Sequence, residues 1–277
     1  MIATIRAEWR KSRFRPAFLV AAGIMSALTI LVYGVNWYLA LNPGSARTDR
    51  AIVNILTLYP DQFVNNVMGA AFPLGAAMAI VVGALFTGSE FGWGTMKTMF
   101  TQRPGRLTVW TGRVVVFAAW MLVMTVVLFA TGAAMSVIVA SFQGHAITWP
   151  AAIDLLKGLG AVWLIFFVNG AIGMALGTLL RQGAAALGIG LIYVLAVEII
   201  AVRFIGLINN GAYKWVTDQF VNQNATALTR SFTSPAFATG VPSASTITAE
   251  HAVLVLVAYG VGLVIVAAGL LRFRDVT

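Results

Sequence analysis

Few side chains in this 277-residue sequence are of the types that perform bond chemistry. Cysteine is absent, which excludes thiolate nucleophiles and Cys-rich metal sites, and the two histidines, His145 and His251, are 106 positions apart. Gly83 and Gly88 have the spacing of a phosphate-binding loop, but Ser89 stands where the essential lysine is required. We therefore expect no catalytic residue, metal or cofactor on this chain.

Three polar residues lie inside long apolar stretches and are candidates for a substrate path. Glu198 and Arg203 are the only charges well inside a predicted span, and an ionisable group in a membrane is costly enough to indicate function. The alternative is that this span ends early and leaves both side chains as a solvated pair near the outer headgroups. Asn169 either lines a polar path or hydrogen-bonds a neighbouring helix.

The segments that carry these residues predict an all-α polytopic membrane protein. Hydrophobic residues make up 60% of the chain and charged residues 10%, whereas soluble domains are typically about 25% charged. Uncharged stretches of about 20 residues recur, which suits membrane-crossing helices, and they lack the alternation of barrel strands. We expect a single transmembrane domain over 1–277, with spans at 16–41, 62–88, 109–141, 151–180, 184–207 and 251–271.

Two local signals refine these spans. Pro73 predicts a kink in the second span, because proline removes one helical hydrogen bond. Gly170, Gly173 and Gly177 recur at spacings of three and four residues, which predicts a face of close helix packing on the fourth span.

The distribution of charge predicts the orientation of the spans. With a cytoplasmic N-terminus, the inner segments hold 12 of the 18 basic and 3 of the 9 acidic residues, so the whole net charge of +9 lies on that side. The positive-inside tendency then favours cytoplasmic N- and C-termini, an extracellular segment at 208–250, and no nucleic-acid partner. The inner basic residues are Arg6, Arg10, Lys11, Arg13, Arg15, Lys97, Arg103, Arg106, Arg113, Arg181, Arg272 and Arg274.

Residues 1–15 predict an amphipathic helix on the membrane surface. An apolar stripe formed by helical spacing runs beside a row of arginines, and this suits a helix in the headgroup layer with its apolar side toward lipid. The alternative is a basic tail that only orients the first span. The stripe consists of Ile2, Ile5 and Trp9, and the arginines are Arg6, Arg10 and Arg13.

The segment 89–106, between the second and third spans, carries an apolar stripe on the predicted cytoplasmic side. Thr95 can cap a short helix, and behind it Met96, Met99 and Phe100 recur at helical spacing. A Met-bearing stripe on a short exposed helix suits the groove of a partner protein. The alternative is that the stripe lies on the membrane or packs under the bundle.

On these motifs the sequence resembles the ABC-2 type family of ABC transporter permeases. In that family the second span is followed by an acidic residue, Gly-Thr, a short apolar helix and basic residues that lead into the third span. Arg113 stands where lysine is commoner, and Glu8-Trp9-Arg10-Lys11 is similar to the family's opening elbow helix. The matching residues are Glu90, Gly94, Thr95, Met96, Lys97, Met99, Phe100, Arg106 and Arg113.

The resemblance implies a permease subunit that pairs with a second permease subunit and with cytoplasmic ATPase subunits, which bind ATP and Mg²⁺. The coupling segment 89–106 would be the main ATPase contact and the turn at Arg181 a smaller one. Such a protein would lie in the cell membrane of a prokaryote and export a drug, peptide or lipid. The alternatives are an ATP-independent carrier or channel and a membrane anchor without transport activity.

Overall fold

The computed structural model is all-helical in the residues it describes, which are 1–42, 55–92, 105–208, 213–233 and 247–273. Six helical segments are long and apolar enough to cross a membrane, so the protein is a multi-pass membrane protein and the predicted fold class is confirmed. These candidate spans are Pro16–Leu41 (α2), Pro60–Gly92, Arg106–Gln143 (α7), Ala152–Leu180 (α8), Gly183–Leu207 and Ala249–Phe273 (α13).

The second candidate span is interrupted where the sequence predicts a kink. Phe72 has an extended backbone, with φ −138° and ψ 132°, and the following Pro73 has no N–H to donate to the preceding turn. The helical hydrogen bonding is therefore broken near the middle of the span. Its parts are η1 (Pro60–Gln62), α4 (Phe63–Ala70), η2 (Ala71–Gly75) and α5 (Ala76–Gly92).

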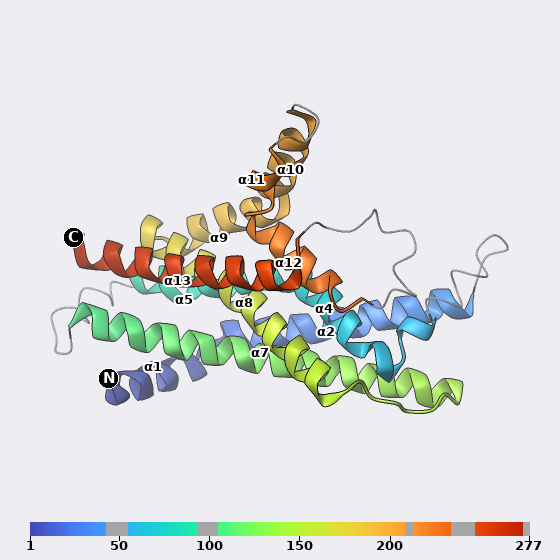
Figure 1. Cartoon of the computed structure of the whole chain (residues 1–277). Coiled ribbons are helices and arrows are strands. Elements are labelled where there is room, and N and C mark those ends of the chain that lie inside the picture. Colours follow the sequence, from blue (N-terminus) through green and yellow to red (C-terminus); the bar gives the residue numbers. More distant parts are fainter. Residues whose placement is uncertain (43–54, 93–104, 209–212, 234–246, 274–277) are drawn as a thin grey trace.

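At the centre of the bundle α5 packs against α8 (Figure 1). α8 is the most enclosed of the six candidate spans. Glycines allow the two backbones to approach closely. A Cβ on Gly83 would lie 2.0 Å from the carbonyl oxygen of Gly170, and one on Gly173 would lie 2.2 Å from that of Ile80. The predicted close-packing face of the fourth span is therefore confirmed.

The fifth candidate span is bent. It consists of α9 (Gly183–Ile192), a π-helical turn η3 (Tyr193–Val197) and α10 (Glu198–Leu207). After η3 the chain turns, and α10 points away from the bundle, whereas α9 lies along it (Figure 1). The span expected over 184–207 thus consists of two helices of different direction, consistent with the tendency of π-turns to bend helices.

Short helices accompany the six candidate spans. α1 (Ile2–Arg13) packs beside the first half of α7, and its start and the C-terminal end of α13 lie at the same end of the bundle (Figure 1). Within 208–250 the described helices are α11 (Lys214–Thr217) and α12 (Val221–Arg230). α12 is not peripheral, because it packs against α13 and α4.

Candidate functional site

A buried ionic cluster joins α1, α5 and α7. Its centre is Glu90, in the last turn of α5, whose side chain is completely buried. Lys11 Nζ lies 2.6 Å from Glu90 Oε2, the Arg15 guanidinium pairs with Oε1, and Arg113 Nη2 lies 4.0 Å from Oε1. One carboxylate thus lies near three cations: Lys11 on α1, Arg15 at the junction of α1 and α2, and Arg113 on α7.

The carbonyl of Phe86, one turn before Glu90, strengthens this arrangement. Arg113 Nη2 donates to it over 2.5 Å and Arg15 Nη1 over 3.3 Å. The Phe86 ring also lies near both guanidinium carbons, at 5.0 Å from Arg113 and 5.9 Å from Arg15. Guanidinium groups suit such a position because they combine several donors with a flat face that stacks on aromatic rings.

Electrostatics in the cluster are governed by removal from water. Burial lowers the pKa of Lys11 to about 8 and that of Arg15 to about 10, while the carboxylate of Glu8 acts in the opposite direction on both. Glu8 is itself only 4% exposed. Two carboxylates therefore face three cations, and the arrangement suits a fixed structural joint, since breaking one buried partner leaves its neighbours uncompensated.

Aromatic packing fixes α1 against α7 beside the cluster. The Trp9 ring stacks on Trp120 with centroids 5.3 Å apart, and Trp120 Nε1 donates to Ser12 Oγ over 2.8 Å. Ile5 packs against the core, whereas Ile2 is 77% exposed. The stripe predicted to face lipid is therefore divided, since Ile5 and Trp9 contact the bundle, and the arginines at 6, 10 and 13 are exposed.

The structure describes part of the predicted ATPase-coupling set. Arg106 donates from Nη1 to the carbonyl of Leu271 over 3.4 Å, which ties the start of α7 to the end of α13. Arg181 occupies a left-handed turn conformation with φ 55° between α8 and α9. Gly94, Thr95, Met96, Lys97, Met99 and Phe100 lie outside the described residues.

The turn at Arg181 lies against the end of α5. A Cβ on Gly88 would lie 2.4 Å from Gly183 Cα, so the backbone after Arg181 contacts α5 two residues before Glu90. The segment following α5 and the turn at Arg181 are the two places expected to meet an ATPase. The described end of α5, where that segment begins, is therefore adjacent to the turn.

The candidates for a substrate path are not brought together. Asn169 is buried in α8, and its amide donates to Ile165 O of the same helix over 2.9 Å, so a donated bond to a neighbouring helix is not formed. Its Oδ1 accepts no hydrogen bond within the described part of the chain. Arg203 is exposed on α10.

Glu198 instead holds the N-terminus of α12. It is 3% exposed and accepts from the backbone N–H of Asn222 over 2.5 Å and of Gln223 over 3.3 Å. The Asn222 amide donates in turn to Val194 O over 2.9 Å, within η3. The solvated pair considered for Glu198 and Arg203 is therefore wrong, because a carboxylate at a helix N-terminus satisfies free amides and is favoured by the helix dipole.

The sequence did not predict Lys11 and Arg15 as partners of Glu90; both count among the inner basic residues, and Lys11 lies in the stretch similar to an elbow helix. Their spacing of four residues, with Glu8 at i−3 from Lys11, was the available signal for one polar helical face. No protein-family model matches the chain, and no curated protein sequence matches it either.

Proposed function

We propose that this chain is the permease subunit of an ATP-binding cassette exporter, driven by separate ATPase subunits. The observation that supports it best is the Glu90 cluster, which ties α1, α5 and α7 together on either side of the segment that would contact the ATPase. A carrier or anchor does not require a buried ionic joint at that place.

In this mechanism the ATPase pushes on the 89–106 segment and on the turn at Arg181. The cluster makes α1 and the adjoining ends of α5 and α7 move as one body, because separating them would leave buried charges without their partners. The close packing of α5 on α8 then passes the displacement into the centre of the bundle. Two arrangements of the spans would open to opposite sides of the membrane, and ATP would shift their populations.

The partners follow from the same proposal. ATP and Mg²⁺ bind to the cytoplasmic ATPase subunits, and a second permease subunit, identical or related, completes the pathway in a prokaryotic cell membrane. The cargo is a hydrophobic or amphipathic molecule such as a drug, peptide or lipid, because the described spans are lined mainly by apolar residues. An ATP-independent carrier would be expected to hold charged groups deep in several spans.

Affinity purification of the full chain from its native membranes tests this function. The expected result is co-purification of an ABC ATPase polypeptide, identified by mass spectrometry, together with ATP hydrolysis in the complex. Met96→Asp places a charge in the expected coupling stripe and should abolish both. Ile147→Asp, which makes the same change at a 49% exposed position in the loop between α7 and α8, is the control and should retain both.

The outcomes separate the three candidate functions. A chain that transports without any nucleotide-hydrolysing companion is a carrier or channel, and one that retains an ATPase but moves no cargo is an anchor. Equal ATPase recovery with Met96→Asp and Ile147→Asp would remove the 89–106 segment from the coupling role.

A further inference from the structure

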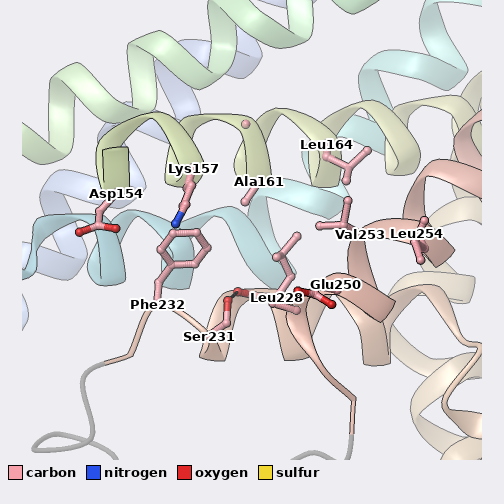
Figure 2. A pocket seen from close by; sticks show the side chains of 12 residues that line it. Asp154, Lys157, Ala161, Leu164, Leu228, Ser231, Phe232, Glu250, Val253 and Leu254 are labelled. Carbon is pink, nitrogen blue, oxygen red and sulfur yellow. Dashed lines mark hydrogen bonds between the residues drawn. The ribbon is translucent and has the colours of Figure 1, made fainter. Parts of the chain in front are cut away.

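A cavity of about 880 Å³ lies between α8, the end of α12 and the start of α13 (Figure 2). This volume falls within the range of about 300–1,000 Å³ typical of small-molecule sites. Its walls are mainly apolar and include Leu164, Leu228, Val253 and Leu254. It lies toward the end of α8 opposite to the turn at Arg181, and therefore on the side remote from the Glu90 cluster.

A smaller, more polar cavity of about 320 Å³ adjoins it. The two share Asp154, Ser231 and Phe232, so these residues lie at the boundary between the apolar cavity and the polar one. The smaller cavity adds Asp61 and further amide side chains. A molecule that occupies both would have an apolar body and a polar head, with the head near Asp154.

The charges around the two cavities favour a cation. The described lining residues include three carboxylates, Asp61, Asp154 and Glu250, and a single ammonium group, Lys157. Asp154, Lys157 and Glu250 form no ion pair with one another or with any other described residue. All four charged side chains are exposed. A ligand that carries an ammonium group would therefore meet more negative than positive charge at the rim of the cavities, beside a surface that removes apolar area from water.

We propose that this pair of cavities binds a cationic amphiphile, with its protonated amine at Asp154 and its apolar part between α8 and α13. The site is separate from the residues assigned to ATPase coupling. Its occupancy can be measured on this chain alone, so the proposal does not rest on the proposed transport function. An anionic amphiphile would gain only from Lys157 and would be opposed by three carboxylates.

The test is photolabelling of the full chain in nanodiscs with a long-chain alkylamine that carries a diazirine. Mass spectrometry should place the label on peptides that contain Leu164 or Val253 and Leu254. Dodecylamine should compete with labelling, and dodecanol and dodecyl sulfate should compete less well. Stronger competition by the sulfate, or equal competition by the amine and the alcohol, would overturn the assignment of a cationic head.

Gly160 offers a variant that fills the cavity. It lines the larger cavity, and a Cβ placed on it meets no heavy atom within 4 Å, so a side chain can be attached to α8 here without a clash at its first carbon. Gly160→Leu should reduce labelling at least tenfold. Gly262→Leu is the matched control, because Gly262 has the same free space on α13 but does not line the cavity.

The carboxylate is tested separately. Asp154→Asn should weaken binding of the alkylamine by about two- to fivefold, as expected for one ion pair at an exposed carboxylate. Asp218→Asn, a carboxylate outside both cavities, should leave it unchanged. Labelling that is undiminished by Gly160→Leu and equally strong at lipid-exposed residues such as Ile265 would show partition into the bilayer and overturn the site.

Discussion

Replacing Glu90 by glutamine keeps the size of the side chain and removes the charge at the centre of the ionic cluster. Lys11, Arg15 and Arg113 then remain in a buried site without their main counter-ion. Two charges 4 Å apart interact by about 4 kcal/mol at an effective dielectric constant of about 20. Because three cations lose this partner at a site where Arg113 is fully buried and Arg15 is largely buried, the substitution should strongly destabilise the folded chain.

The measured loss should nevertheless be smaller than the sum of the three contacts. Glu8 stays in place and continues to favour the charged forms of Lys11 and Arg15. Removing one partner of a buried pair typically costs about 3–5 kcal/mol, and we expect Glu90→Gln to lie near the lower end, at about 3 kcal/mol. The assay is equilibrium unfolding of the purified chain in bicelles by added SDS, followed by tryptophan fluorescence, since Trp9 and Trp120 stack beside the cluster.

The free energy of unfolding should also depend on pH through Lys11. Burial lowers the pKa of Lys11 from 10.5 to about 8, so between these values the unfolded chain binds more protons than the folded one. The contribution of Lys11 to the free energy of unfolding therefore rises with pH across this window. Loss of the Glu90 carboxylate should lower the pKa of Lys11 further, so the destabilisation by Glu90→Gln should shrink as the pH is raised toward about 8, and adding Lys11→Met should remove that dependence.

Glu250→Gln provides the matched control, because it makes the same chemical change at an exposed carboxylate at the start of α13. Surface substitutions of this kind usually change stability by less than about 0.5 kcal/mol. If Glu90→Gln and Glu250→Gln had equal effects, the cluster would not hold the three elements together, and its role in coupling would be refuted.

Three further predictions address other parts of the chain. Gly83→Ala should cost about 1–3 kcal/mol by forcing α5 away from α8, whereas Gly262→Ala should be almost neutral, and equal unfolding curves would contradict the close packing. Glu198→Gln should speed amide hydrogen exchange across α12 while ATPase recovery stays normal, and unchanged exchange would count against the anchoring role. Because the chain lacks cysteine, Ile147→Cys should react with an impermeant maleimide in intact cells and Arg6→Cys only after permeabilisation; the reverse pattern would invert the topology.

The candidate spans could be predicted from sequence because hydrophobic length is a local property. The break at Pro73 could also be predicted, because the missing N–H of proline acts within one helical turn. The glycine face of α8 could be predicted because the spacing of its glycines places small residues on one side of the helix. α7 starts at Arg106, three residues earlier than the expected span, and the Arg106 side chain contacts Leu271 O. That contact joins residues that are distant in the sequence.

The partners of the buried charges could not be predicted for the same reason. Glu90 is separated from Lys11 by 79 positions and from Arg15 by 75, and Glu198 from Asn222 by 24. Residue type indicates that a carboxylate in an apolar environment needs a partner, but several cations and helix ends satisfy that need equally well. Only the packing of α1 and α12 onto the bundle selects among them.

The contacts of α5 also indicate where the bundle would bend if the end of α5 that carries Glu90 were pushed. α5 is held by close glycine packing against α8 on one face and by the Glu90 cluster toward α1 and α7 on another, so its own helix is firmly braced. At its other end the extended Phe72 interrupts the helical hydrogen bonding that would tie it to α4. A displacement applied at Glu90 would therefore carry α5 as a rigid rod, and the break at Phe72 would absorb the change in angle, since helix ends with unsatisfied or interrupted bonding are the usual hinges.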